Sequence, residues 1–145
     1  TQSPGIGILI SKNEVLPLYR PRPKFSHKGT YGHGVIVGGS YGKTGSIVLA
    51  TKAALRTGAG MITAYTPECG YNVLQTAVPE AMVITDNDDE LEEIKLDFTP
   101  SAIGIGIGLG TSSKTTKAFE EFLTKNKSPL LKSSKNNFSK EKSNV

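Results

Sequence analysis

Two short apolar runs of the sequence each end in glycines and are each followed by helix-forming residues. The first stretch reads GVIVGGSYGKTGS at residues 34–46, and the second reads AIGIGIGLG at residues 102–110. A buried strand that turns through glycines into a helix is typical of a βαβ unit in a parallel sheet. The carboxyl ends of parallel strands share one edge of the sheet, where open α/β sheets bind ligands. The two stretches therefore predict an α/β fold with a ligand site between the loops.

The rest of the pattern extends this alternation. Gly58 is placed to end the first helix, and Ser112 and Ser113 are both candidates for capping the last one. Strands are predicted at 35–37, 61–66, 81–85, 102–110 and, as a short opening, 129–131; helices are predicted at 46–57, 70–78 and 111–126. The fold class expected from the residues is α/β with a mostly parallel sheet.

The two ends of the chain differ from this pattern. Residues 1–23 are expected to form an extended lead-in, because Pro17, Pro21 and Pro23 disfavour an ordinary helix across 16–29. Residues 132–145 are rich in Lys, Ser and Asn and have only Phe138 and Val145 as apolar residues, so they are expected to be a disordered basic tail. The boundaries predicted from the sequence are thus 1–23, 24–131 and 132–145.

Composition narrows the class of protein. With 145 residues, 37% of them hydrophobic and 21% charged, the chain suits one globular domain. No apolar run approaches the roughly 18 residues of a membrane span. The lone Cys69 excludes an internal disulfide and a cysteine-based metal site. The sequence shows no secretory signal, so we expect a cytoplasmic protein without a membrane partner.

The positive net charge does not by itself indicate a nucleic-acid partner. Of the formal charge of +4, residues 128–145 carry +3, so the charge belongs mainly to the tail. That tail lacks interleaved aromatic residues and any known nucleic-acid motif, so nucleic-acid binding is the weakest of the functions considered.

The first glycine stretch resembles a phosphate-binding loop but fails the Walker A spacing. The letters GKT are present at residues 42–44, yet the leading glycine of G-x-x-x-x-G-K-[ST] would have to stand at Val37. The second stretch lacks the G-x-G-x-x-G spacing, because Leu109 and Thr111 stand where the last glycine is needed. Helix-end binding of a phosphate is still compatible with both loops, and Lys43 remains open as either a phosphate contact or an exposed loop lysine.

Other candidate sites are weaker. The acidic run at 86–97 does not fit an EF-hand, because Leu91 takes the place of the glycine and Asp97 that of the glutamate. His27 and His33 have no third residue at metal-ligand spacing, so surface or capping roles are favoured over ligation. The residues GGSYG are not the G-x-S-x-G nucleophile elbow.

Residues 24–67, KFSHKGTYGHGVIVGGSYGKTGSIVLATKAALRTGAGMITAYTP, closely resemble the NAD(P)H-hydrate dehydratase family. That family has a similar H-K-G-x-x-G run, a G-G-S/D loop and an A-A-L-R-x-G-A-G helix end. The segments VPEAMV at 78–83 and AIGIGIGLG at 102–110 are similar to its later P-E-x-M and I-G-P-G-L-G segments, in the same order. The resemblance covers residues 24 to about 131.

The resemblance implies a ribokinase-like three-layer α/β/α fold with a mostly parallel sheet, here truncated. It implies a lyase reaction that repairs a damaged cofactor, namely the ATP- or ADP-dependent dehydration of (S)-NAD(P)H hydrate, with Mg²⁺. The substrate-binding residues that it implies are Ser46, Gly106, Gly108 and Gly110. Residues for the cofactor, a metal or catalysis are not assigned, and a homo-oligomer is left open.

Two departures from the family pattern affect the expected activity. Ile107 stands where the family usually has proline, which removes a fixed φ from the second loop. After residue 131 the family continues with D-A-D-A-L, H-P-G-E and G-D-x-L-x-G segments, the last with the catalytic aspartate, and these are not found in residues 132–145. We therefore expect this truncated chain to be inactive alone, with a non-catalytic nucleotide-binding or assembly fragment as the alternative.

Overall fold

The computed structural model describes residues 10–19, 21–86, 89–125 and 130–132. The strands are β1 (His33–Gly38), β2 (Met61–Pro67), β3 (Met82–Asp86), β4 (Ala102–Ile107) and β5 (Leu130–Lys132). The helices are α1 (Lys12–Val15), α2 (Thr44–Arg56), α3 (Tyr71–Ala77) and α4 (Ser113–Lys125), with short 3₁₀ turns η1 (Leu16–Leu18), η2 (Lys28–Tyr31) and η3 (Glu68–Gly70).

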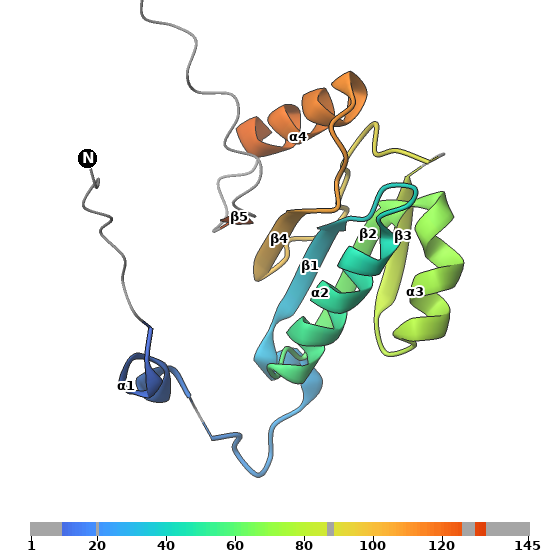
Figure 1. The fold of residues 1–145 in the computed structure, drawn as a ribbon. Coiled ribbons are helices and arrows are strands. Elements are labelled where there is room, and N and C mark those ends of the chain that lie inside the picture. Colours follow the sequence, from blue (N-terminus) through green and yellow to red (C-terminus); the bar gives the residue numbers. More distant parts are fainter. Residues whose placement is uncertain (1–9, 20, 87–88, 126–129, 133–145) are drawn as a thin grey trace, which may run out of the picture.

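All pairs of neighbouring strands are parallel, and the sheet order is β3-β2-β1-β4-β5. The chain therefore moves outward from β1 to β3 and then crosses back to β4 on the other side of β1. Figure 1 shows β1 at the middle of the sheet, with β2 on one side of it and β4 on the other. The point where this order reverses lies between the carboxyl ends of β1 and β4, the usual place for a ligand in such sheets.

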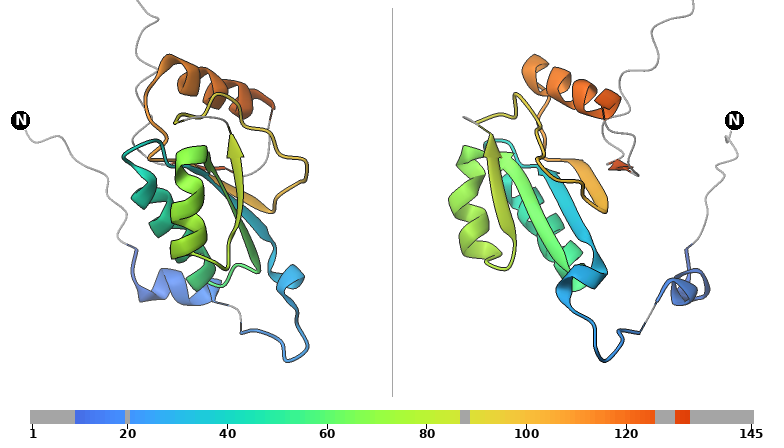
Figure 2. Two further views of the ribbon diagram at one scale, coloured as in Figure 1. Left: turned by 90° about the vertical axis from the view of Figure 1, so that its right-hand side faces the viewer. Right: turned by 180° about the vertical axis from the view of Figure 1, so that it is seen from behind.

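The side chains of β1 alternate between two cores, one on each face of the sheet. Val35 and Val37 belong to a core with Phe122 of α4, while Ile36 packs against the core formed with α2 and α3. Helices α2 and α3 thus cover one face, and α4 with the segment 91–98 covers the other (Figures 1 and 2). Fully burying each such aliphatic side chain stabilises the fold by roughly 1.5–3 kcal/mol.

The predicted elements within the domain are confirmed, with small shifts at their ends. Helix α2 begins at Thr44, two residues before the predicted start at Ser46. Of the two predicted caps of α4, the structure shows Ser112 as the N-cap: its hydroxyl accepts a hydrogen bond from the Thr115 N–H at 3.2 Å, and Ser113 is the first residue of the helix. Asp86, the first residue of the acidic run, ends β3, and the part of the run described at 89–97 is irregular.

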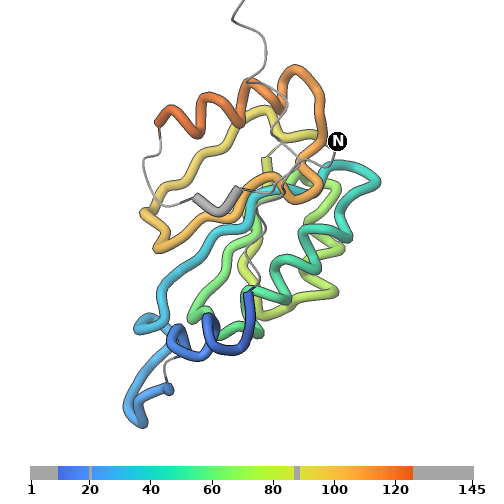
Figure 3. The backbone as a smooth tube through the Cα atoms, turned by 60° about the vertical axis from the view of Figure 1, so that its left-hand side comes forward, coloured from blue at the N-terminus to red at the C-terminus, as the bar shows by residue number. Residues whose placement is uncertain are grey.

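The extended lead-in is partly wrong, because residues 12–18 form α1 followed by η1. The helix begins at a capping box. The Ser11 hydroxyl accepts a hydrogen bond from the Asn13 N–H at 3.3 Å, and the Glu14 carboxylate accepts one from the Ser11 N–H at 2.7 Å. Pro17 ends regular helix, as expected. Figure 3 shows this segment in blue at the end of the sheet where β1 begins, away from α4. The predicted tail beyond Lys132 lies outside the described residues.

Candidate functional site

The loops that follow β1 and β4 are bound directly to each other. The backbone N–H of Gly39 donates to the Ile107 carbonyl at 2.9 Å, and the N–H of Ser40 donates to the Gly108 carbonyl at 2.7 Å. The Ser40 hydroxyl donates to the same Gly108 carbonyl at 2.9 Å. Because these bonds continue the β1–β4 ladder past the strand ends, the two loops form one unit at the edge of the sheet.

Gly106 is the point at which the register of the two strands changes. Val37 pairs with Ile105, but the next residue, Gly38, pairs with Ile107, so Gly106 is an extra residue in β4. Its φ of 110° lies in a region that residues with a side chain rarely adopt. Such bulges redirect a strand near its end and are common beside active sites. The predicted substrate-binding residue Gly106 therefore shapes the turn of the second loop.

Ser46 and Gly108 lie against each other where the loops meet. A Cβ atom on Gly108 would lie 2.1 Å from the Ser46 hydroxyl oxygen, and the φ of Gly108 is +63°. The Ser46 hydroxyl donates to the Lys43 carbonyl at 2.6 Å. Glycine at 108 is thus required both by the close approach and by the backbone conformation. Gly110 lies next to Ser40. A Cβ atom added to Gly110 would lie 3.5 Å from the Ser40 side chain, which is an ordinary van der Waals contact.

A cavity of about 580 Å³ lies beside this joint. It combines backbone from both glycine loops with residues of the first turn of α4 and of the acidic segment. The lining residues are Ser40, Tyr41, Lys43, Asp89, Glu90, Leu109, Gly110, Thr111, Ser112 and Thr115. Helices α2 and α4 both begin here, so the positive ends of two helix dipoles lie at the same edge of the sheet.

The acidic segment forms one wall of the cavity. The Tyr41 N–H donates to the Asp89 carbonyl at 3.1 Å, which joins this segment to the first loop. Asp89 also lies near Cys69, where burial, followed by the charge of Asp89, raises the pKa of the thiol. A raised pKa keeps the thiol protonated at neutral pH, so Cys69 is a poor nucleophile.

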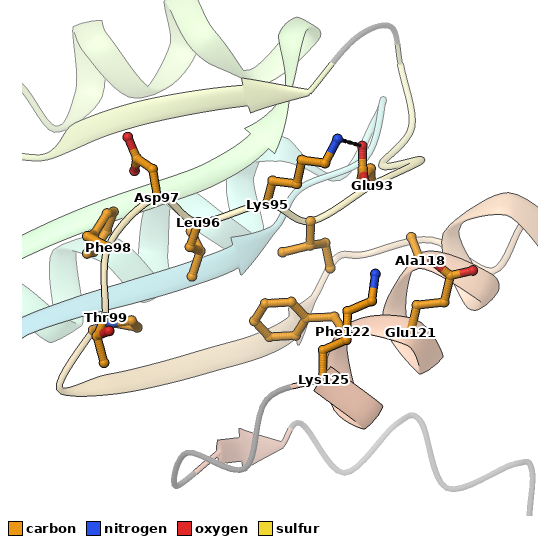
Figure 4. Close-up of a pocket in the computed structure, with 12 residues that line it drawn as sticks. Glu93, Lys95, Leu96, Asp97, Phe98, Thr99, Ala118, Glu121, Phe122 and Lys125 are labelled. Carbon is orange, nitrogen blue, oxygen red and sulfur yellow. Dashed lines mark ion pairs between the residues drawn. The ribbon is translucent and has the colours of Figure 1, made fainter.

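A second cavity of about 630 Å³ lies between the segment 93–100 and α4 (Figure 4). Phe122 points from α4 toward Leu96, and Lys95 forms an ion pair with Glu93 at 2.7 Å. Neither glycine loop contributes to its lining. Although it is the larger of the two cavities, it is remote from the convergent N–H groups of the helix ends, so the cavity between the loops is the better candidate site.

The two histidines lie elsewhere. The His33 ring stacks on Phe98 with centroids 4.4 Å apart, and its Nε2 atom lies 2.8 Å from the Thr63 hydroxyl oxygen. Because His33 is the first residue of β1, it is at the opposite end of the strand from the glycine loop. His27 is exposed and precedes η2. Neither side chain lines the cavity between the two loops.

The structure places the four predicted site residues at one edge of the sheet. It brings Ser46 and Gly108 into contact. Of the four, only Gly110 lines the cavity, whereas Ser46, Gly106 and Gly108 do not. Sequence reasoning missed Ser40, although its position directly after Gly38-Gly39 was a usable signal. It also missed Asp89, which reaches the site only through the fold of the acidic segment.

Among the residues that the structure describes, no group of three or more histidine, cysteine, aspartate or glutamate side chains could hold a metal ion. Within the same part of the chain, no helix is long and apolar enough to cross a lipid bilayer.

Comparison with known proteins agrees with this geometry. The NAD(P)H-hydrate dehydratase family matches residues 34–143. An ADP-dependent (S)-NAD(P)H-hydrate dehydratase from Staphylococcus aureus is 39% identical over 108 residues, which are 74% of this chain and 38% of that relative. The chain thus spans about two fifths of the length of this relative.

Solved structures show the same architecture. An ADP/ATP-dependent NAD(P)H-hydrate dehydratase from Bacillus subtilis, co-crystallised with ATP and Mg²⁺, superposes with a TM-score of 0.72 at 29% identity, over 84% of this chain and 44% of that one. A ribokinase-like protein from Enterococcus faecalis superposes with a TM-score of 0.62 at 24% identity, over 77% of this chain and 39% of that one. The predicted ribokinase-like fold is therefore confirmed for the part of it that this chain spans, and the chain belongs to the NAD(P)H-hydrate dehydratase family.

Proposed function

We propose that this chain provides the substrate-binding part of an ADP- or ATP-dependent (S)-NAD(P)H-hydrate dehydratase, a lyase that repairs hydrated nicotinamide nucleotides. The observation that carries this proposal is the joint between the two glycine loops at the point where the strand order reverses. Two helix starts, the glycine-rich turns after two strands and a cavity meet there, at the place where open α/β sheets bind phosphate-containing nucleotides.

In this proposal the loop residues shape the site and do not react. Gly106 and Gly108 allow the second loop to bend against the first, and Gly110 exposes backbone to the cavity. Ser46 serves by being small, because its hydroxyl already donates to Lys43. The hydrated nicotinamide nucleotide would lie along these residues, and the cytoplasmic location expected from the sequence suits such a substrate.

The phosphoryl donor has no assigned site in this chain. The described residues contain no candidate metal cluster, and the first loop lacks the Walker A spacing. We therefore derive no step through ATP, ADP or Mg²⁺. We propose that these 145 residues alone bind the hydrate without turning it over.

The alternative is a non-catalytic nucleotide-binding or assembly fragment. One experiment separates the possibilities. The purified chain is titrated with (S)-NADPH hydrate in a calorimeter and assayed for NADPH formation with ADP or ATP. The assay is repeated with the part of the Staphylococcus aureus relative beyond the matched 108 residues.

Binding without turnover by the chain alone, and turnover only with the second polypeptide, would support an assembly fragment of the dehydratase. Turnover by the chain alone would refute the proposed inactivity. Absence of hydrate binding would refute the substrate-binding role.

A further inference from the structure

We propose that Lys43 is the residue that holds the diphosphate of the nucleotide in this site. This inference rests on the proposed function and deepens it, because it assigns a specific charge contact to a cavity otherwise described by its backbone. It also decides between the two interpretations of Lys43 that the sequence left open.

The backbone of Lys43 is held in place by both loops. Its N–H donates to the Ser40 carbonyl at 2.8 Å, and its carbonyl accepts from the Ser46 N–H at 3.1 Å and from the Ser46 hydroxyl at 2.6 Å. A Cβ on Gly108 would lie 3.2 Å from the Lys43 Cβ, so the second loop packs against the base of the side chain. The attachment point of the ammonium group is therefore fixed beside the cavity, and only the side chain beyond it needs ordering when an anion binds.

The charges around the cavity make Lys43 distinctive. Among the described residues that line it, Lys43 is the only cation, while Asp89 and Glu90 are anions. Within that same part of the chain, Lys43 takes part in none of the ion pairs, which involve Lys95, Lys114 and Lys117. A diphosphate entering this cavity would meet two carboxylates, so its binding depends on a compensating positive charge.

Two of the neutral donors of the lining are already in use. The Ser40 hydroxyl donates to the Gly108 carbonyl, and the Ser112 hydroxyl donates to the Thr115 hydroxyl at 3.0 Å. A phosphate in the cavity would then meet the Lys43 ammonium, the only charged donor among the described lining residues, together with the Tyr41 and Thr111 hydroxyls. A charged donor makes a stronger hydrogen bond than a neutral one, so Lys43 is expected to contribute most among the side chains.

The test compares Lys43→Gln, Lys43→Arg and the matched control Lys52→Gln in the full chain. Lys52 lies on α2, the helix that begins directly after Lys43, but outside the cavity lining. Dissociation constants for (S)-NADPH hydrate are measured by calorimetry at low and moderate salt. We expect Lys43→Gln to weaken binding by about tenfold or more, and Lys43→Arg and Lys52→Gln to stay within about threefold of the parent chain.

A second set of variants tests the sign of the charge effect. Glu90→Gln removes one repelling carboxylate from the wall, and Asp89→Asn does so while keeping the backbone carbonyl that accepts from Tyr41. Both variants are expected to bind the hydrate about twofold to fivefold more tightly, and the gain is expected to shrink as salt is added. Tighter binding in these variants would show that the diphosphate lies in this cavity beside Lys43, and unchanged binding would place the diphosphate elsewhere and overturn the assignment.

The outcomes separate this inference from the proposed function. If the parent chain binds the hydrate and Lys43→Gln binds it equally well, the assignment of Lys43 is overturned while the substrate-binding role stands. If the parent chain does not bind the hydrate, both are overturned. Circular dichroism and thermal melting of each variant show whether a loss of binding reflects a loss of folded protein.

Discussion

The glycines at and after the end of β1 lie in two different environments, one packed and one open. A Cβ on Gly38 would lie 2.0 Å from the Ile107 carbonyl oxygen, and one on Gly39 would lie 2.6 Å from the Ile47 side chain. By contrast, Gly42 and Gly45 of the same loop region have no atom within 4 Å of such a Cβ. The packed glycines join the two loops, whereas the open ones leave backbone accessible beside the cavity.

The largest expected effect comes from filling the packed position in β1. In Gly38→Ala the new methyl group would overlap the Ile107 backbone, which cannot move without breaking the Gly39 N–H bond to the same carbonyl. We expect the free energy of unfolding to fall by about 3 kcal/mol or more, measured by urea denaturation.

The contrast between the two environments supplies the control. Gly45→Ala introduces a methyl group into open space within the first turn of α2, where alanine is the better helix former. It is expected to raise the free energy of unfolding by about 0.5–1 kcal/mol. Equal stability of the Gly38 and Gly45 variants would show that the loops are not joined as described.

An intermediate effect is expected at Gly42, which is open but has a φ of +74°. Gly42→Ala should cost about 1 kcal/mol through backbone strain alone, because no neighbour has to move. The measurement is the same urea transition, with Gly45→Ala again as the reference. A cost as large as that of Gly38→Ala would mean that Gly42 is packed, and would remove the distinction between the two classes.

Sequence reasoning could predict the elements but not which glycines are packed. The β-branched run ending at Gly38 and the helix formers ending before Gly58 fix β1 and α2, because local propensity and hydrophobic pattern agree there. The bulge at Gly106 depends on the register between β1 and β4, which are about seventy residues apart. Local patterns carry no information on that register, so the extra residue could not be foreseen.

In the candidate site, too, some residues could be predicted from local sequence patterns and others could not. The positions of Ser46, Gly106, Gly108 and Gly110 at one sheet edge follow from the parallel strands that the sequence predicts. Asp89 and Glu90 enter the lining through an irregular segment fixed by bonds from the Glu92 and Glu93 N–H groups to the Asp86 carboxylate, at 2.7 and 2.8 Å. Charge runs are usually solvated surfaces, so composition gave no reason to place these two acids beside the loops.

The smallest effect is expected at Ser46. Although it is a polar residue, Ser46 is packed closely against Gly108. Its hydroxyl donates to the Lys43 carbonyl, which also accepts the Ser46 N–H, so Ser46→Ala leaves that carbonyl with one partner. The loss of one hydrogen bond is offset by the better helix propensity of alanine, and the free energy of unfolding should change by less than about 0.5 kcal/mol. Hydrate affinity, measured by calorimetry, should stay within about twofold of the parent chain, because the hydroxyl is already bonded within the loop. A large loss of affinity would show that the hydroxyl turns from Lys43 to the nucleotide, and that Ser46 is a direct contact rather than a small residue that lets Gly108 approach.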